Sequence, residues 1–251
     1  MLQEKMEKRV AEKRKEIWKE VKGYKGWYSV SNKRNYPKNG YPSVTQVIGQ
    51  LNSFVLMEWF KRTPYNEIME ASKRGCEIGT QMHDTIQLFI ETGEAKIDTE
   101  YPKEITTALQ SFMLFKKDHP EYDLQRSEIP MACDKYGING TTDCVAMRDK
   151  KLWIADWKSA KISKSGFPVI YSEAKIQVAA YCMMLNEVEN KNIESALIVA
   201  IAKDAVSYSI YEMDKEEIEG QFNNVFLPLL KVWNYKKQQK QKEKEGIFYV
   251  K

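Results

Sequence analysis

The spacing of apolar positions changes along the chain, and each change marks a new kind of element. Apolar residues recur at helical spacing over residues 54–91 and again over residues 102–117. The period then shortens to two over residues 124–131, 137–147 and 151–157, which predicts three strands in succession. This part of the chain is therefore expected to be helical segments followed by a three-stranded meander.

The following segments return to helical spacing and then to strands. Residues 172–189 have a helical pattern, residues 194–202 and 205–213 have strand patterns, and a last helix begins after Asp214. Pro228 falls inside that last helix, where its missing N–H predicts a break or a kink. The order of helices, meander, helix and two strands predicts an α/β fold.

The first 40 residues differ in composition from the rest. Residues 2–22 alternate charges and have few apolar positions, which predicts a solvated helix or a flexible arm. Residues 23–49 are rich in Gly, Pro, Asn and Tyr, so we expect loops with a short strand near residues 27–30. We therefore divide the chain into a charged helix and loop region, residues 1–40, and a single domain, residues 41–251.

Length and composition exclude several classes of protein. The chain has 251 residues, 43% of them hydrophobic, which is enough to bury one sizeable core. No apolar run is long enough to span a membrane and no secretory or transit signal is evident, so we expect a cytoplasmic protein of a bacterium or a phage-infected cell. The four cysteines lack metal-binding spacing, which disfavours a zinc ribbon or an iron–sulfur cluster. The net charge of +4 permits nucleic-acid binding without demanding it.

The segment IADWKSAK, residues 154–161, places two opposite charges on the apolar face of a predicted strand. Asp156 and Lys158 are two positions apart, so they project to the same side as Ile154. A simple ion pair at the end of a strand would explain an isolated Asp-x-Lys. A catalytic role for the pair therefore needs further groups close by.

The preceding hairpin provides a partner for this aspartate. Asp149–Lys150 is a plausible two-residue loop, so Asp143 is expected to face Asp156 across the two strands. Thr141 then faces Lys158. Two carboxylates this close repel each other unless a cation bridges them, and hard oxygen ligands suit Mg²⁺ or Mn²⁺. The alternative, with Asp143 in a turn, needs no metal.

Two helical faces carry further candidate groups. Gly75, Gly79 and His83 recur every four residues, so the missing side chains would let this helix approach a sheet or a phosphate. A lone helical histidine is more often structural, so a metal role for His83 depends on its meeting the two aspartates. Gln177 and Tyr181 share one face of a later helix, where the glutamine bonds either a core backbone group or a bound phosphate or base.

The same motifs, in this order, resemble the RecB-type branch of the PD-(D/E)XK nuclease superfamily. The resemblance covers roughly residues 41–211, and YPSVTQVIG adds a likeness to the subgroup of mitochondrial genome maintenance exonucleases and related phage exonucleases. It implies a restriction-endonuclease-like core, with a central mixed sheet flanked by helices and with helical N-terminal additions. The segments that carry the resemblance are His83 in GTQMHDTI, Asp143 in GINGTTD, Asp156 with Lys158 in IADWKSAK, and Gln177 with Tyr181.

The resemblance also implies roles for the central residues. His83, Asp143 and Asp156 would be ligands of Mg²⁺ or Mn²⁺, with the backbone carbonyl of Trp157 as a fourth ligand. Lys158 would orient or deprotonate the attacking water and stabilise charge that develops on the phosphate. All of these residues are therefore candidates for the catalytic centre.

Other residues would support this centre or hold DNA. Glu128 would support the metal ligands from the preceding strand, unless it is an ordinary exposed strand residue. The iron–sulfur cluster of some family members is not expected, because no cysteine follows Cys182. Gln177 and Tyr181 would hold DNA near the scissile phosphate. Further candidates to bind phosphates or stack on bases are Ser43, Thr45, Trp59, Phe60, Lys61, Lys161, Lys164 and Phe167.

The function implied by the resemblance is hydrolysis of phosphodiester bonds in DNA. We expect a metal-dependent exonuclease that prefers single-stranded ends and acts in DNA replication, recombination or repair. A structure-specific or restriction-like endonuclease is the alternative within the enzyme class, and a non-catalytic DNA-binding accessory protein is the alternative outside it. A structural protein would need all of these motif residues to fall in family order by chance.

Overall fold

The computed structural model describes residues 40–51, 54–93 and 102–244. The charged helix predicted over residues 2–22 and the strand predicted near residues 27–30 lie outside this part of the chain. Within it, none of the helices is both long enough and apolar enough to cross a membrane.

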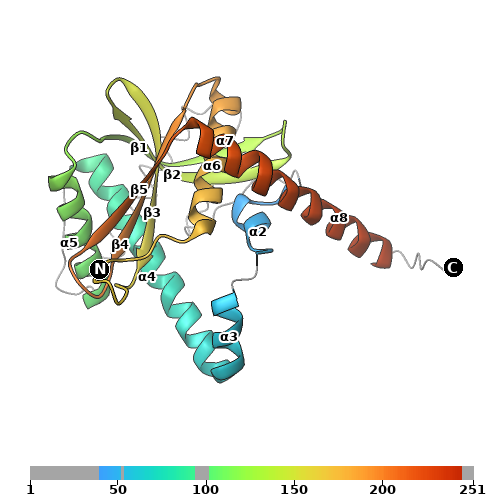
Figure 1. The fold of residues 1–251 in the computed structure, drawn as a ribbon, viewed down its shortest axis with the longest axis horizontal. Coiled ribbons are helices and arrows are strands. Elements are labelled where there is room, and N and C mark those ends of the chain that lie inside the picture. The colour runs from blue at the N-terminus through green and yellow to red at the C-terminus, as the bar shows by residue number, and fades with distance from the viewer. Residues whose placement is uncertain (1–39, 52–53, 94–101, 245–251) are drawn as a thin grey trace.

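In the described part of the chain, five strands form one mixed sheet (Figure 1). They lie side by side in chain order, and neighbours are antiparallel except β3 and β4, which are parallel. A parallel pair requires a crossover, which α6 supplies. The predicted α/β fold is confirmed. The elements of the sheet are β1 (Asp123–Cys133), β2 (Ile138–Arg148), β3 (Lys151–Ala160), β4 (Ser195–Ala202) and β5 (Tyr208–Met213), with α6 at Ser172–Glu189.

Helices cover both faces of this sheet (Figure 1). The buried apolar side chains of α4 and α5 form one cluster with the sheet, and those of α2, α6, α7 and α8 form another on its opposite face. The candidate residues Asp143, Asp156 and Lys158 therefore lie in a sheet that is packed from both sides. The helices are α2 (Val44–Ile48), α3 (Phe54–Arg62), α4 (Tyr65–Thr92), α5 (Lys103–Asp118), α7 (Lys215–Gln221) and α8 (Leu227–Lys244), with a π-helical turn η1 at Phe222–Phe226.

Two prolines modify the predicted helices. The single helix predicted over residues 54–91 is two helices, because Pro64 cannot continue α3 but fits just before the first residue of α4. Near Pro228 the chain forms the π-helical turn η1 instead of a break, and the N–H of Leu227 donates to the carbonyl of Phe222. The wider turn precedes the proline, whose missing N–H would interrupt a regular α-helical ladder.

The β2–β3 hairpin has the predicted two-residue loop. Asp149 and Lys150 have φ values of 53° and 63°, the left-handed pair that a tight hairpin turn requires. Arg148 pairs with Lys151, and the ladder continues to Cys144 opposite Ala155. From the loop as far as Cys144 and Ala155, which are the neighbours of Asp143 and Asp156, the register is therefore the one expected from the sequence.

Trp157 anchors the end of β3 that carries the charges. Its side chain is only 1% exposed, and its ring centroid lies 5.5 Å from that of Phe112 and 6.0 Å from that of Phe115. Neighbouring strand residues point to opposite faces, so Asp156 and Lys158 point away from this aromatic cluster. Burial of the indole thus fixes the direction of both charged side chains.

Candidate active site and metal centre

A cleft of about 490 Å³ brings together side chains from six elements. Seven of the predicted site residues line it, while Asp156 and Trp157 are buried and do not line it. Thr80 and Asp84, which the sequence analysis did not single out, flank His83 on α4; Thr80 is three residues before the histidine, where side chains share a helical face. The lining residues are Thr45, Gly79, Thr80, His83, Asp84, Glu128, Thr141, Asp143, Lys158, Gln177 and Tyr181.

The two strands separate where the aspartates begin. The β2–β3 pairing ends at Cys144 and Ala155, so the predicted direct pairing of Asp143 with Asp156 is not part of the ladder, nor is that of Thr141 with Lys158. Instead, the N–H of Trp157 donates to Oδ2 of Asp143 at 2.9 Å. The N–H of Trp157 thus bonds a side-chain carboxylate in place of a backbone carbonyl. This bond holds Asp143 against β3, and the regular β2–β3 ladder ends at this point.

Three ligand atoms converge beside this opening. Nδ1 of His83 lies 3.4 Å from Oδ1 of Asp143 and 3.9 Å from Oε1 of Glu128. One ligand atom from each of the three residues lies within 4.8 Å of the others. A histidine and two carboxylates at this spacing are a suitable donor set for a divalent cation.

Asp156 is a fully buried carboxylate whose charged neighbour is Lys158. Its residue is 0% exposed, and neither oxygen accepts a hydrogen bond among the described residues, although Nζ of Lys158 lies 2.7 Å from Oδ2. The contact with Lys158 is therefore an ion pair without good hydrogen-bond alignment. A buried carboxylate that is not hydrogen-bonded is unfavourable in a folded protein. The Nδ1 atom of His83 is likewise buried without a hydrogen bond, so these residues fit a bound cation.

The two aspartates differ in pKa because their surroundings differ. Burial raises the pKa of Asp156 to about 6, and the charge of Asp143 adds to this, against the opposing effect of Lys158. Burial also disfavours ionisation of Asp143, but His83, Lys158 and the N–H of Trp157 outweigh it and lower its pKa. Burial lowers the pKa of His83, yet Asp143 and Glu128 together raise it above the ordinary value. The charges of this cluster are thus strongly interdependent.

Glu128 belongs to this cluster and is not an exposed strand residue. It is 4% exposed and has a φ of 49°, a left-handed conformation that is unfavourable for a residue with a side chain. Alternation along the strand is reversed there, because Ser127 hydrogen-bonds Glu91 of α4 whereas Ile129 packs in the cluster of α6. The simple period-two pattern therefore could not have revealed that this carboxylate turns into the site.

Gln177 and Tyr181 form one wall of the cleft. The side-chain amide of Gln177 donates to the hydroxyl of Tyr181 at 3.0 Å, as their spacing of one helical turn allows. The ring of Tyr181 rests on Gly140 of β2, where an added Cβ would lie 2.8 Å from Cε1. The absence of a side chain at Gly140 therefore permits a close approach, and the group that approaches is this tyrosine.

We expect Gly140→Ala to displace Tyr181 and to lower both stability and activity. Forcing a methyl group into packed space costs about 1–3 kcal/mol, which urea unfolding would measure. Gly75→Ala is the matched control, since an added Cβ there meets nothing within 4 Å. This control should gain about 0.5–1 kcal/mol from better helix propensity. Equal effects of the two substitutions would contradict the role given to Gly140.

The glycine stripe on α4 is only partly explained by packing. A Cβ on Gly79 would lie 3.8 Å from Oγ of Ser159 on β3, so this turn of the helix does approach the sheet as predicted. Gly75 does not approach the sheet, because an added Cβ there meets nothing within 4 Å. Close approach thus begins one turn before His83 and brings the histidine to the carboxylates.

The remaining DNA-binding candidates occupy different places. The hydroxyl of Ser43 caps α2 by accepting from the N–H of Gln46 and lies 3.0 Å from the hydroxyl of Thr45, which lines the cleft. The other candidates are exposed and do not line it. They are Trp59, Phe60 and Lys61 on α3, and Lys161, Lys164 and Phe167 after β3.

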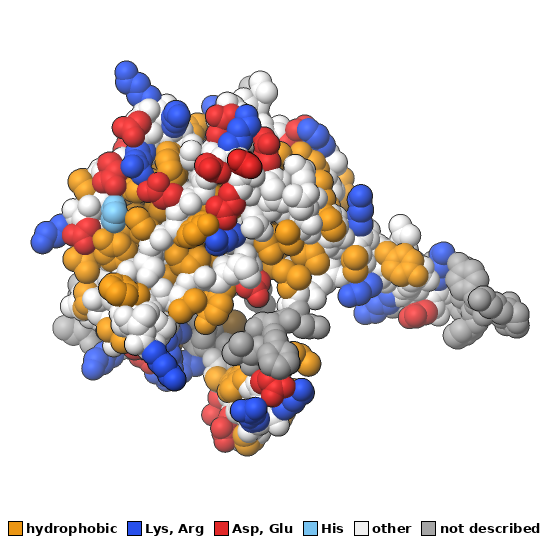
Figure 2. Space-filling model, in the orientation of Figure 1, with side chains coloured by type: hydrophobic (Ala, Val, Ile, Leu, Met, Phe, Trp, Pro, Cys, Tyr) orange, Lys and Arg blue, Asp and Glu red, His pale blue; other side chains and the backbone are white. Residues whose placement is uncertain are grey.

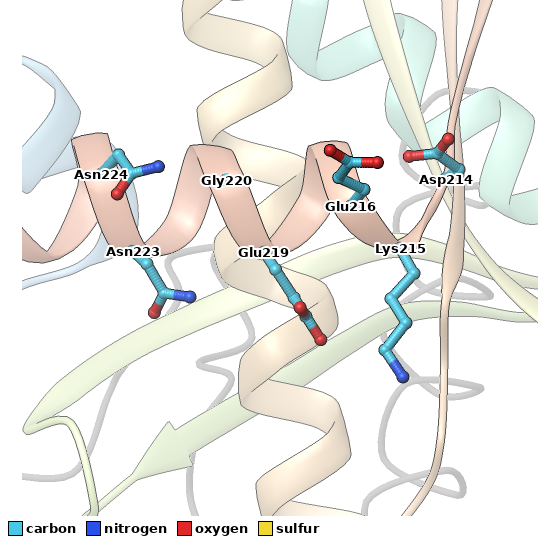
Figure 3. Close-up of a pocket in the computed structure, with 7 residues that line it drawn as sticks. All are labelled: Asp214, Lys215, Glu216, Glu219, Gly220, Asn223 and Asn224. Atoms are coloured by element: carbon cyan, nitrogen blue, oxygen red, sulfur yellow. The ribbon is translucent and has the colours of Figure 1, made fainter.

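A second hollow of about 550 Å³ runs along α7 and η1. Figure 3 shows that its lining side chains come from consecutive turns of one helical segment and point outward. None of the predicted catalytic or DNA-binding residues lies there. The hollow does not gather groups from several elements, so the cleft above the aspartates is the candidate site. Its lining residues are Asp214, Lys215, Glu216, Glu219, Gly220, Asn223 and Asn224.

Comparison with known proteins agrees with this geometry. A family model described as the PD-(D/E)XK nuclease superfamily matches residues 58–246. The chain therefore belongs to the PD-(D/E)XK nuclease superfamily, as the motifs predicted. It is similar to mitochondrial genome maintenance exonuclease 1 of Xenopus tropicalis, with 28% identity over 233 residues. The match covers 84% of this chain but 62% of that protein, so the chain spans less than two thirds of this relative.

Solved structures give weaker likenesses. The crystal structure of SSO0001 has a TM-score of 0.32 and 13% identity, over 61% of this chain and 70% of that chain. An alkaline exonuclease from Laribacter hongkongensis has a TM-score of 0.29 and 9% identity, over 65% of this chain and 85% of that chain. Both scores are low, so the family assignment rests on the sequence match.

Proposed function

We propose that this protein is a Mg²⁺- or Mn²⁺-dependent deoxyribonuclease that removes nucleotides from single-stranded DNA ends. The observation that carries this proposal is the buried carboxylate of Asp156, which has no aligned hydrogen bond and lies beside Lys158 under an open cleft. Membership of a nuclease superfamily makes DNA the expected substrate. Action in DNA replication, recombination or repair follows from the same proposal.

The proposed metal ligands are His83, Asp143 and Asp156, with the backbone carbonyl of Trp157 as a fourth. Glu128 joins them in this proposal, because its carboxylate lies next to His83 and Asp143. A divalent cation held there would polarise the scissile phosphate and lower the pKa of a water molecule. The buried atoms that lack hydrogen-bond partners support this assignment, since a cation would satisfy them.

Lys158 is proposed to act through its positive charge. Its ammonium lies 2.7 Å from the carboxylate of Asp156, with which it forms an ion pair. Of the two roles implied by the resemblance, orienting water and stabilising developing charge therefore fits better than removing a proton. The side chain is 31% exposed, so it can reach a phosphate in the cleft.

The wall of the cleft that Gln177 and Tyr181 form is proposed to hold the DNA strand. Tyr181 is held by Gln177 on one side and by Gly140 on the other, so its position is fixed before any substrate arrives. Thr45 offers a further hydroxyl to the cleft, and Ser43 supports it by capping α2. Lys161 and Lys164 are proposed to contact phosphates outside the cleft.

Cleavage of end-labelled oligonucleotides tests this function. We expect linear single-stranded DNA to be degraded with Mg²⁺ or Mn²⁺ and to remain intact with EDTA, because the carboxylates alone cannot neutralise the charge that develops on the phosphate. Labels at the 5′ end and then at the 3′ end give the polarity. Circular single-stranded DNA is the control: an exonuclease must leave it intact, and its cleavage would establish an endonuclease instead. DNA binding without any cleavage would favour an accessory protein.

A further inference from the structure

The charge of the chain is unevenly distributed. The segment LPLLKVWNYKKQQKQKEK, residues 227–244, contains six lysines and one glutamate, a net charge of +5. The whole chain has a net charge of +4, so all the other residues together carry a net charge of −1. The positive excess of this protein is therefore located in a single helix, α8.

The helix α8 projects from the body of the protein (Figure 1). Its first part is attached to the domain, since Leu230 is buried in the core and the amide of Gln50 donates to the carbonyl of Leu229 at 2.9 Å. Beyond Trp233, Lys236, Lys237 and Lys240 are all exposed. Lysine side chains are visible along the projecting part in Figure 2. The structure thus presents a positively charged arm to the solvent.

Three of these lysines share one side of α8, and that side faces the segment leading to the cleft. Residues at positions i, i+1 and i+4 of a helix lie within about 100° of one another, which groups Lys236, Lys237 and Lys240. The ammonium of Lys237 donates to the carbonyl of Gly40 at 2.6 Å. The chain then runs directly from Gly40 into α2, whose Thr45 lines the cleft.

We propose that α8 binds the phosphates of a DNA strand beyond the part that occupies the cleft. This inference rests on the proposed function, because it assigns the arm to the same substrate. Flexible lysines suit phosphates as point charges without reading sequence. Lys237 contacts Gly40, and the chain leads from Gly40 to Thr45 in the cleft, so a DNA strand that leaves the cleft along this segment reaches α8. The positive charge of the arm is complementary to the negative charge of the DNA. The arm extends the footprint of the enzyme and slows dissociation from long substrates.

An anionic membrane surface fits this helix less well than DNA does. A helix that lies on a membrane buries an apolar face among the lipids, with Trp, Phe or Leu opposite its lysines. Residues 236–244, KKQQKQKEK, contain no apolar side chain. The glutamines between the lysines can instead form hydrogen bonds with phosphates or sugars.

The test compares two triple variants of the 251-residue chain that lose the same charge. One is K236Q/K237Q/K240Q on α8, and the matched control is K117Q/K150Q/K191Q, at exposed positions on α5, the β2–β3 loop and the loop before β4. Glutamine has nearly the helix propensity of lysine, and the control positions are exposed, so both variants should fold, as circular dichroism would verify. Binding to a fluorescent single-stranded oligonucleotide is measured in EDTA over a series of salt concentrations. The oligonucleotide has about 40 nucleotides, which is well beyond the site sizes usual for one domain.

We expect the α8 variant to bind the long strand about tenfold more weakly at low salt. Each phosphate contact with single-stranded DNA contributes about 0.7 to the slope of log K against log salt, so loss of three contacts lowers that slope by about 2. The control variant should keep both the affinity and the slope. Cleavage of a short strand of about 8 nucleotides at saturating concentration should not change, because that length fits within one site.

The outcomes separate this inference from the proposed function. Equal affinity and equal slope for the two variants would overturn the role of α8, even if the enzyme cleaves DNA. Loss of salt-dependent binding in the α8 variant of a protein that cleaves nothing would support the arm and reject the nuclease. The last measurement is sedimentation with vesicles rich in phosphatidylserine. Vesicle binding that the α8 variant alone loses, with DNA binding unchanged, would overturn the proposal in favour of a membrane.

Discussion

We expect Asp156→Asn to abolish cleavage, with a loss of about 10³-fold or more, because the amide lacks the negative charge that holds a cation, and the cation would stabilise the negative charge that develops on the phosphate. The substitution preserves the shape of the side chain in its buried position. Burial raises the pKa of Asp156 to about 6, so ionisation of this group at neutral pH costs more free energy in the folded than in the unfolded protein. We therefore expect the variant to unfold no earlier than the wild type at about pH 7.5 in EDTA.

Initial cleavage rates and thermal unfolding in EDTA check the two halves of this prediction. Asp149→Asn is the matched control, because Asp149 is an exposed aspartate in the loop of the same hairpin. It should keep full activity. An active Asp156→Asn enzyme would contradict the assignment of the catalytic site. A variant that is inactive because it is unfolded would show a lowered midpoint, which Asp149→Asn would not share.

We expect Lys158→Ala to lower cleavage by about 10²–10³-fold while Mn²⁺ binding persists, because the proposed role of the lysine is to stabilise charge near the phosphate and not to bind the metal. Lys158→Arg should keep part of the activity. A guanidinium retains the positive charge but cannot remove a proton at neutral pH, so this variant separates the two roles of the lysine. Single-turnover cleavage and Mn²⁺ titration are the measurements.

Lys151→Ala is the control for this pair of variants, since Lys151 is an exposed lysine at the opposite end of β3. Its activity should equal that of the wild type. Full activity of Lys158→Ala would reject the catalytic centre. An inactive Lys158→Arg enzyme would instead indicate that the lysine acts as a base, in spite of its contact with Asp156.

The hairpin shows how far local pattern can lead. Two short-range features were sufficient to predict its register: the alternation of apolar residues along each strand, and a loop that fits two residues. They correctly predicted Arg148 opposite Lys151 and the arrival of two aspartates at one end of the hairpin. They could not predict that the strands separate there. The separation arises because the side chain of Asp143, and not a backbone carbonyl, accepts the hydrogen bond from the N–H of Trp157.

The helices show the same division. The pattern of residues 172–189 matches the bounds of α6, and Gln177 and Tyr181 lie on one face as their spacing requires. What the tyrosine touches was not predictable, because Gly140 reaches it from a strand that is distant in the sequence. Similarly, the spacing of Gly79 and His83 indicated a close approach by the helix, but only the packed sheet shows which partner meets the histidine.

The sequence by itself determined the order of the elements, the hairpin register and the residue types of the centre, since these depend on spacing along one chain. The tertiary structure alone decided two matters. Trp157 packs against α5 and so turns Asp156 toward the opposite face of the sheet. Glu128 adopts a left-handed conformation that reverses the alternation of its strand and brings its carboxylate to His83. Both depend on packing between distant segments, which local periodicity cannot encode.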